Sequence, residues 1–400
     1  NCNKFKCIDK EGVNIKRYSM EYCKIDCLVL YKCFEKFRSY LTEFTHLYTE
    51  DYMTISAVAQ QYTILNKCYD DVYAIAGKAR AFIQKCVVGG RCMTANNEIQ
   101  IPKINTDDLE DRINVYDVNS LYPSAMIRMD GVPKGIPKVI TPETNLKDVS
   151  CYYVRVKVLS IEKRLNFPLQ SVKVDGIRNF TNDLIGKEIY IDNISLDDFI
   201  EHQGVKVEII QGYYYNDGFN NTINSVIDTL YTERKRFKKA GNPIQEVIKL
   251  ILNSIYGKSM LAPITERQYF VYDNEELAKQ ITRNYNQITR PIVQVGTEKY
   301  LISKFKPIHN HFNNVQFGVL VLGWSKRIMN EAMVLADDKI FYQDTDSMHM
   351  KKKDYDELSV KFESKYGRPI DGNQLGQMHD DFPSINGLPA SAIDSAYLAK

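Results

Sequence analysis

The 400-residue chain lacks the features that mark several protein classes. Its 52 basic and 50 acidic residues leave a formal charge of only +2, which argues against binding nucleic acid through bulk positive charge alone. No run approaches the roughly 18 apolar residues of a membrane-spanning helix, so no membrane partner is expected. Repeats and low-complexity tracts are also absent. The 44% hydrophobic content is that of a globular protein, which excludes disorder and collagen-like structure.

Cysteine is present but shows no disulfide or zinc pattern. All nine cysteines fall within the first 151 residues, an odd number without paired CxxC motifs. Cys23 and Cys27 could share one helix face, and without histidine partners nearby they are predicted to be core thiols rather than zinc ligands. The thiol content indicates a reducing intracellular compartment. A chain that opens on Asn1 rather than methionine is expected to be a fragment.

Hydrophobic periodicity predicts a mixture of helices and strands. A long amphipathic helix is expected to be capped by Ser19 and to carry an apolar stripe. Ala240-Gly241-Asn242-Pro243 is a short connection, so the helices that flank it should be antiparallel. The expected elements are helices over about 19–45, 220–239, 243–257 and 317–336, strand-like segments from 151 to 215, and hairpin strands at 340–342 and 347–350.

Three segments carry side chains that suggest chemistry. Asp117 ends a β-prone run before a helix start, and Asp344 and Asp346 occupy the turn of the predicted hairpin. Each has an ordinary explanation as a cap or turn residue. Together, carboxylates on rigid strand ends can bring two divalent cations to about 3.5–4 Å, the separation used in phosphoryl displacement. A helix face that could meet a triphosphate carries, at i, i+4 and i+7, Lys249, Asn253 and Tyr256.

These segments resemble three motifs of a known family. The matching residues are Asp117-x-x-Ser120-Leu121-Tyr122-Pro123-Ser124, Lys249-x-x-x-Asn253-Ser254-x-Tyr256-Gly257 and Tyr342-x-Asp344-Thr345-Asp346-Ser347. In this order they are similar to motifs A, B and C of family B DNA polymerases, in the protein-primed branch of phages, linear plasmids and virophages. The resemblance implies an α+β right-hand core, with an antiparallel palm sheet and helical-hairpin fingers. It also implies template-directed addition of dNTPs to a primer 3′-hydroxyl or a protein hydroxyl.

The resemblance implies a role for each matching position. Asp117 and Asp346 are expected to bind two Mg²⁺ ions, for which Mn²⁺ can substitute, with the carbonyl of Val118 assisting and Asp344 supporting the catalytic site. Tyr122 matches the steric gate that excludes a 2′-hydroxyl. The residues expected to contact the nucleotide are Ser120, Leu121, Tyr122, Arg234, Lys238, Lys249, Asn253 and Tyr256. The residues expected to contact DNA are Ser254, Gly257, Gly89, Gly90, Lys326 and Arg327.

Some of these assignments have competitors. For the phosphate contacts of Arg234 and Lys238, the alternatives are Lys235, Arg236 and Lys239, or a solvated basic face. For Trp324, beside the two basic residues of the predicted DNA-binding helix, core packing is as good an interpretation as DNA contact.

A remnant of a second activity is expected at the N-terminus. Tyr22-x-x-x-Asp26 resembles the third motif of a 3′–5′ exonuclease, but the two earlier acidic motifs do not precede it. Gly89-Gly90 occupies the position of the YxGG element of this branch, although Val87 stands where the tyrosine is expected. The chain also ends where a KxY motif and thumb should begin. The exonuclease domain is therefore expected to be incomplete, and the thumb absent.

The resemblance implies an order of domains and partners. Primer-template DNA and dNTPs are the expected partners, with a terminal priming protein as an optional third, in a virus- or plasmid-encoded protein. Two alternatives stay open: a catalytically silent nucleic-acid-binding remnant, and a reverse transcriptase or RNA polymerase with a similar palm. The expected domains are an exonuclease remnant and linker (1–85), the palm start with motif A (86–130), palm strands with a terminal-protein-region-like insertion (131–220), fingers with motif B (221–258), and palm with motif C, ending before a thumb (259–400).

Overall fold

The computed structural model divides the chain into two compact units. Unit 1 draws on Asn1–Cys68 and Ser225–Ile255, and unit 2 on Tyr69–Asn224 and Tyr256–Lys400. None of the described helices combines the length and apolarity that crossing a lipid bilayer requires. The structure describes residues 7–9, 12–103, 111–261, 265–306, 313–381, 384–385 and 388–389.

The long helix of unit 1, α1 (Ile15–Thr45), begins before the predicted position. The side chain of Asn14 accepts a hydrogen bond from the Arg17 N–H at 3.0 Å, so Asn14 rather than Ser19 caps the helix. Over its described residues, burial on α1 is confined to the C-terminal end, at Leu41 and Thr45. The predicted apolar stripe exists but is exposed, at Leu28, Leu30, Tyr31 and Phe34.

The same exposure overturns one prediction about cysteine. Cys23 and Cys27 are both exposed on α1, so the expectation that they are core thiols is wrong. Their spacing does place them on one helix face, as the sequence indicated. A helix pattern predicts which residues share a face, but burial also needs a packing partner for that face.

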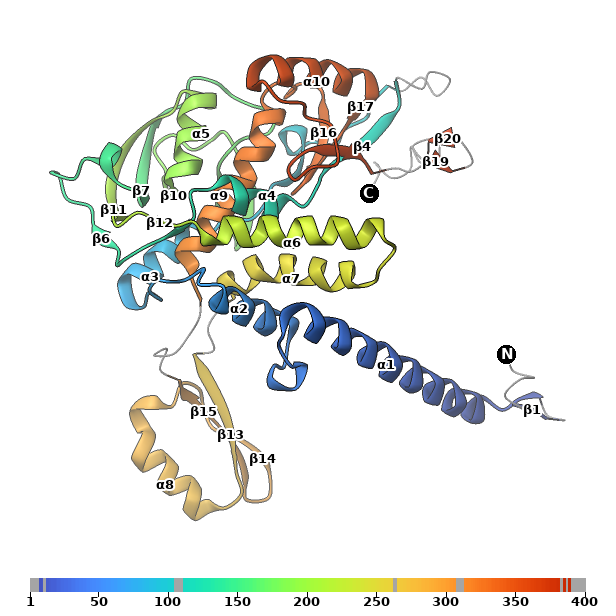
Figure 1. The fold of residues 1–400 in the computed structure, drawn as a ribbon. Coiled ribbons are helices and arrows are strands. Elements are labelled where there is room, and N and C mark those ends of the chain that lie inside the picture. Colours follow the sequence, from blue (N-terminus) through green and yellow to red (C-terminus); the bar gives the residue numbers. More distant parts are fainter. Residues whose placement is uncertain are drawn as a thin grey trace. The chain divides into compact units, whose positions relative to one another are not determined.

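The predicted helical hairpin is present as α6 (Thr222–Lys239) and α7 (Ile244–Met260). Gly241 adopts a φ of 63°, and the N–H groups of Gly241 and Asn242 donate to carbonyls of the last turn of α6. This left-handed closure ends α6 and reverses the chain. Figure 1 shows the two helices running antiparallel, which confirms the prediction from the short connection.

The central sheet of unit 2 has five antiparallel strands in the order β18-β4-β17-β16-β3. Alternation along β4 buries Asn114, Tyr116 and Val118 on one face, where the Tyr116 ring stacks on Tyr355 of α10 with centroids 3.5 Å apart. The strands are β3 (Cys92–Thr94), β4 (Ile113–Val118), β16 (Ile340–Asp344), β17 (Ser347–Lys351) and β18 (Met378–Asp380). The accompanying helices are α4 (Leu121–Arg128), α9 (Val315–Met333) and α10 (Lys352–Tyr366). The predicted β16–β17 hairpin and the α9 helix are confirmed.

A second sheet, ordered β10-β7-β11-β6, occupies the region predicted to be strand-like. That prediction missed the helix α5 (Asn193–Gln203), which begins where the Asp192 carboxylate accepts the Ser195 N–H at 2.9 Å. Asp192, the cap residue, is also the last residue of β10, so the hydrophobic pattern changes from strand to helix periodicity within two residues. The strands are β6 (Lys138–Val139), β7 (Cys151–Ser160), β10 (Glu188–Asp192) and β11 (Lys206–Tyr215), with a separate hairpin of β8 (Ser171–Val174) and β9 (Ile177–Phe180).

A third sheet lies between α7 and α9 in the sequence and was not predicted. It has the order β13-β15-β14, and α8 (Asn274–Asn284) follows its first strand. Its strands are β13 (Glu266–Val271), β14 (Val293–Gly296) and β15 (Lys299–Phe305). The smaller described elements are β1 (Ile8–Asp9), β2 (Gly12–Val13), α2 (Ile55–Leu65), α3 (Gly77–Ile83), β5 (Val132–Pro133), β12 (Phe219–Asn220), β19 (Ser384–Ile385), β20 (Leu388–Pro389) and short 3-10 turns at 49–51, 84–86, 95–97, 146–148 and 285–287.

Candidate active site

Asp117 and Asp346 come from separate segments and meet at one end of the central sheet. Asp117 lies near the end of β4, opposite Ser347 of β17 in the antiparallel register. The N–H of Val118 donates to the carbonyl of Asp346 at 2.8 Å, which ties the strand end to the hairpin turn. The backbone therefore brings together the two aspartates that the sequence nominated as metal ligands.

The hairpin turn is tight, and its two acids differ in exposure. Thr345 adopts a positive φ of 49°, and the Asp346 N–H donates to the Asp344 carbonyl at 2.6 Å. Asp344 is exposed at the end of β16, whereas Asp346 is half-buried. The two acids of the motif therefore differ in environment, with Asp346 on the side of Asp117.

Crowded carboxylates raise one another's pKa. Burial, and then the charges of Asp346 and Asp381, raise the pKa of Asp117 from 3.8 to about 7. Burial also raises the pKa of Asp346, with further contributions from Asp344 and Asp381. Without a cation, the surroundings of Asp117 and Asp346 in the folded protein disfavour the charged form of each carboxyl group. A divalent cation at this point would reverse that preference.

Asp381 is an acidic neighbour that motif matching missed. It follows β18, which pairs with β4 so that His379 lies opposite Asp117, and its N–H donates to the Val115 carbonyl at 2.9 Å. The sequence carried a signal, because Asp380 and Asp381 follow Met378 and His379 in a short β-prone run. Only the strand order shows that this run lies beside β4.

The donor set fits hard divalent cations in an open site. No cluster of three or more His, Cys, Asp or Glu side chains in the described part of the chain forms a ready-made metal cage. Mg²⁺ is commonly held by one or two carboxylates together with water and substrate phosphates, rather than by a cage of protein ligands. The pair Asp117 and Asp346 satisfies that requirement. The crowding of their charges gives an electrostatic reason for a cation to bind.

Backbone N–H groups lie at the start of α4, directly after Asp117 and Val118. Ser120 adopts a left-handed conformation, with φ 53° and ψ 63°, and the helix begins at Leu121. A left-handed residue followed by helical residues turns successive N–H groups toward one side, which is the geometry of an anion-binding nest. The side chain of Ser120 accepts no capping hydrogen bond from α4. The nest therefore fits the predicted contacts of Ser120 and Leu121 with the nucleotide.

Two tyrosines from different motifs stack on each other. The rings of Tyr122 on α4 and Tyr256 on α7 lie 4.4 Å apart between centroids, with an interplanar angle of 14°. Burial raises the pKa of both phenols, so both remain neutral near neutral pH. The structure thus brings together the predicted steric gate, Tyr122, and a second predicted nucleotide contact, Tyr256.

Comparison with known proteins places the chain in a family. Residues 3–363 match the family model described as DNA polymerase type B, organellar and viral. The chain belongs to this polymerase family. A probable DNA polymerase of Neurospora intermedia is 27% identical over 384 residues, covering 90% of this chain and 36% of the relative. The DNA polymerase of Streptococcus phage Cp-1 is 23% identical over 352 residues, covering 84% of this chain and 55% of the relative.

Solved structures confirm the right-hand polymerase fold. Phi29 DNA polymerase in an orthorhombic crystal form aligns with a TM-score of 0.57 at 19% identity, covering 83% of this chain and 53% of that one. The ternary complex of the same enzyme gives the same values.

A second fungal relative is the DNA polymerase of Kluyveromyces lactis, which is 25% identical over 374 residues. The match covers 90% of this chain and 35% of that polymerase. The chain thus spans about a third of the length of the two fungal relatives.

The remaining nucleotide-binding candidates of this family member lie in unit 1. Lys249 and Asn253 are exposed on α7, and Lys238 is exposed on α6. Among the competitors on α6, Arg236 forms an ion pair with Glu233 at 2.5 Å. Their contacts with nucleotide stay predictions, as do those of Arg234, Ser254 and Gly257 with nucleotide or DNA. The exonuclease-motif residues Tyr22 and Asp26 are both exposed on α1, and their assignment also stays a prediction.

Lys326, which was predicted to contact DNA, is enclosed within unit 2. Every residue of α9 except Trp324 and Arg327 is buried. Lys326 itself is only 6% exposed, and its ammonium donates to the Val88 carbonyl at 3.1 Å. Burial lowers its pKa, which marks an internal lysine rather than one facing a phosphate. The sequence showed a basic pair on a helix but not that the helix is enclosed.

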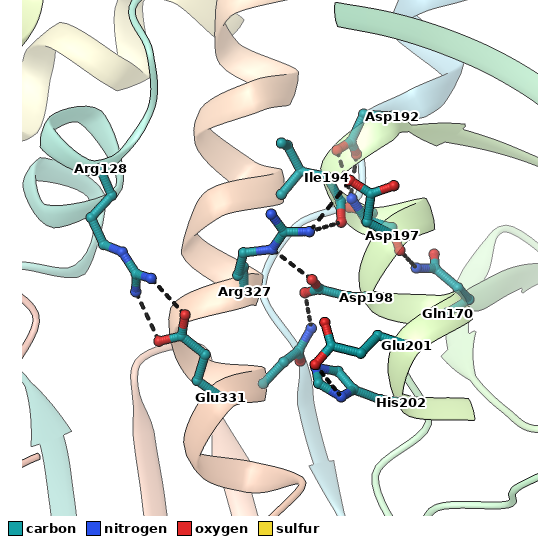
Figure 2. A network of polar contacts seen from close by, with 12 residues as sticks. Arg128, Gln170, Asp192, Ile194, Asp197, Asp198, Glu201, His202, Arg327 and Glu331 are labelled. Atoms are coloured by element: carbon teal, nitrogen blue, oxygen red, sulfur yellow. Dashed lines mark hydrogen bonds and ion pairs between the residues drawn. The ribbon is translucent and has the colours of Figure 1, made fainter. Parts of the chain in front are cut away.

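Arg327 is also engaged inside unit 2. Its Nε donates to Asp198 of α5 at 2.6 Å, and its Nη2 donates to the Ile194 carbonyl at 2.9 Å (Figure 2). The Trp324 ring lies between the guanidinium groups of Arg327 and Arg128, at 5.2 and 5.6 Å. Arg128 in turn donates to Glu331, as Figure 2 shows. These contacts hold the side chains of Trp324 and Arg327 against neighbouring parts of unit 2, while the predicted DNA contact of Arg327 stays a prediction.

Gly90 and Gly89 differ in their surroundings. A Cβ on Gly90 would lie 2.6 Å from a side-chain carbon of Thr345, whereas nothing lies within 4 Å of a Cβ on Gly89. Only glycine at position 90 allows the backbone to approach the acidic turn this closely. Their predicted DNA contacts stay predictions, but Gly90 has a packing role beside the active-site turn.

The raised pKa of Asp117 predicts a pH-dependent stability in the absence of metal. The folded state binds this proton up to about pH 7, whereas the unfolded state releases it near pH 4. The free energy of unfolding should therefore fall as the pH rises from about 4 to about 7. Thermal melts with EDTA at a series of pH values measure this fall. Asp117→Asn should make the fall in stability shallower. Asp381→Asn should move the upper limit of the pH range over which stability falls to lower pH. The same dependence of the melting temperature on pH in all three proteins would contradict the assignment.

Proposed function

We propose that this chain is the core of a DNA-directed DNA polymerase that adds dNTPs to a primer 3′-hydroxyl. One observation carries the proposal: Asp117 and Asp346, from separate motifs, are held at one sheet end by the 2.8 Å hydrogen bond from Val118 to Asp346. Family membership over residues 3–363 supports the same activity. Protein-primed initiation on a protein hydroxyl is part of the proposal, and its support is the resemblance to the protein-primed branch.

Asp117 and Asp346 would hold the divalent cations, with the Val118 carbonyl assisting and Asp344 beside them. Two Mg²⁺ ions bound there would stabilise charge on the attacking and leaving oxygens of an in-line displacement, and Mn²⁺ would serve the same purpose. Asp117 must be ionised to act as a ligand, and its raised pKa means that proton release accompanies metal binding near neutral pH. The pairing of β4 with β17 and the hydrogen bond from Val118 to Asp346 hold the backbone of both residues before substrate arrives.

The nucleotide would be bound by backbone and side-chain groups of motifs A and B and of α6. The left-handed Ser120 and the first N–H groups of α4 supply donors for the triphosphate. The Tyr122 ring, supported by its stack on Tyr256, would lie beneath the sugar and leave no space for a 2′-hydroxyl. The exposed Lys249 and Asn253 of α7, with Arg234 and Lys238 of α6, are proposed to contact the incoming nucleotide.

Primer-template DNA is the proposed macromolecular partner, and a terminal priming protein is proposed for residues 131–220. Structures of phi29 DNA polymerase include a binary complex with primer-template DNA and a ternary complex with incoming nucleotides. The proposed origin is a virus or linear plasmid, as for the phage relative. The alternatives of a silent nucleic-acid-binding remnant and an RNA-directed polymerase are outcomes of the first experiment below.

Asp346→Asn should abolish primer extension while leaving DNA binding unchanged, because the substitution removes a metal ligand and not a DNA contact. Extension with Mg²⁺ and a gel shift measure the two properties, and Asp338→Asn, at an exposed position, is the matched control. Residual extension within about tenfold of the parent, a barrier change of about 1.4 kcal/mol, would refute the assignment. A gel shift without extension by the parent would identify a silent remnant. Preference for an RNA template would identify the third class.

Tyr122→Val should admit ribonucleotides, because the smaller side chain opens space beneath the sugar. The ratio of kcat/KM for dNTP to that for rNTP should fall by at least about tenfold, since a lost steric exclusion of this size is worth about 1–3 kcal/mol. Tyr285→Val, at a residue 76% exposed, controls for loss of a tyrosine. An unchanged ratio in the folded variant would refute the steric role.

A further inference from the structure

Arg91 is a buried arginine next to the acidic turn, and none of the motifs includes it. It is 1% exposed, and it precedes β3, the strand that pairs with β16 so that Cys92 lies opposite Asp344. A buried guanidinium is costly unless its donors are satisfied. Its partners therefore show what it is arranged to hold.

The side chain of Arg91 joins α9 to the strand that carries Asp344. Its Nη2 donates to the Asn330 amide oxygen at 2.5 Å, and its Nη1 donates to the Gln343 amide oxygen at 3.1 Å. Gln343 is 1% exposed and directly precedes Asp344. Because the fork of a guanidinium is rigid, it fixes the distance between these two partners.

The backbone of Arg91 contacts the other side of the same aspartate. The carbonyl of Arg91 accepts the Thr345 N–H at 2.8 Å. Gly90 lets the chain approach, since a Cβ there would collide with the Thr345 side chain. One residue therefore holds Gln343 through its side chain and Thr345 through its backbone, and these two residues flank Asp344.

The anchor of Arg91 is itself held. The Asn330 amide donates to Asp198 at 2.9 Å, and Asp198 also accepts from Arg327 at 2.6 Å. Asp198 is buried on α5, so the series of contacts runs from α5 through α9 to β16. The position of the hairpin is thus set relative to two helices as well as to its neighbouring strands.

We propose that Arg91 is a positioning residue that fixes the Asp344–Asp346 turn relative to Asp117. This inference rests on the proposed polymerase function, to which it adds a residue outside the three motifs. Arg91 touches no substrate and acts through Gln343 and Thr345. A misplaced carboxylate should weaken the chemical step more than nucleotide binding, because a displacement of about 1 Å in an active site can cost about 100-fold in rate.

The test compares Arg91→Met and Arg91→Lys with the parent and with Arg178→Met. Arg178 is a half-buried arginine on β9 that donates to Ser171 at 3.0 Å, so its replacement controls for loss of a guanidinium away from the turn. In single-nucleotide extension, kcat should fall roughly 10- to 100-fold in both Arg91 variants, while KM for dNTP changes less than about 3-fold. The lysine variant keeps a positive charge but not the fork, so it should not restore kcat.

Two readouts do not depend on activity. Hydrogen exchange of the 340–351 peptide, measured without metal, should be faster in both Arg91 variants and unchanged in Arg178→Met. Mn²⁺ binding, followed by electron paramagnetic resonance, should weaken in the same two variants. If the parent does not extend primers, the polymerase proposal fails, and these two readouts still decide the role of Arg91.

The opposite results would overturn the proposal. If folded Arg91→Met retains the parent kcat, hairpin exchange and Mn²⁺ affinity, Arg91 does not position the turn. If its melting temperature falls while those three quantities stay at parent values, its role is stability alone. Restoration of kcat by Arg91→Lys would show that charge rather than the fork is required, which would also contradict the mechanism.

Discussion

Burial of neighbouring carboxylates at the end of the central sheet is the constraint that the strand pairing of unit 2 must overcome. Burial is the main cause that raises the pKa of Asp117 and of Asp346, and the charge of Asp381 adds to the effect on both. Such an arrangement opposes folding unless the backbone imposes it. Here the antiparallel pairing of β18, β4 and β17 places the acidic residues near one another. The Val118–Asp346 hydrogen bond joins the end of β4 to the hairpin turn.

Support for the strained acidic end comes from α9, a helix that is buried on nearly all sides. Several of its polar residues bond neighbouring elements, with Glu331 accepting from Arg128 of α4 and from Arg368 after α10. Arg327 and Asn330 both bond Asp198 of α5. Since an unpaired buried charge is costly, each of these groups specifies where its partner must lie. The helix therefore relates the motif A helix to the elements around the motif C hairpin.

The sequence predicted the parts of the site that depend on local chemistry. The hairpin around Asp344 and Asp346 and the turn after α6 follow from short-range rules, because turns and closing glycines restrict the nearby backbone directly. Asp117 at a strand end before a helix was predicted on the same grounds. The structure agrees with all of these local features.

The features that were missed depend on contacts distant in sequence. Asp381 enters the site only because β18 pairs with β4, and Lys326 is removed from the surface only because α9 is enclosed. The exposed stripe of α1 shows the converse, since an amphipathic pattern does not supply the surface that would cover it. α5 was missed because its cap, Asp192, is also the last residue of a strand.

The stack of Tyr122 on Tyr256 connects two residues whose roles were predicted from separate motifs. Each tyrosine was assigned a role from its own motif, and neither assignment implied contact between the rings. Their stack fixes the start of α4 against the C-terminal part of α7. Stacked aromatic rings prefer particular offsets, so a shift of α7 would move the Tyr122 ring as well. Because α4 begins shortly after β4, the proposed discrimination of the sugar by Tyr122 and the proposed metal binding by Asp117 would depend on the same short segment of backbone.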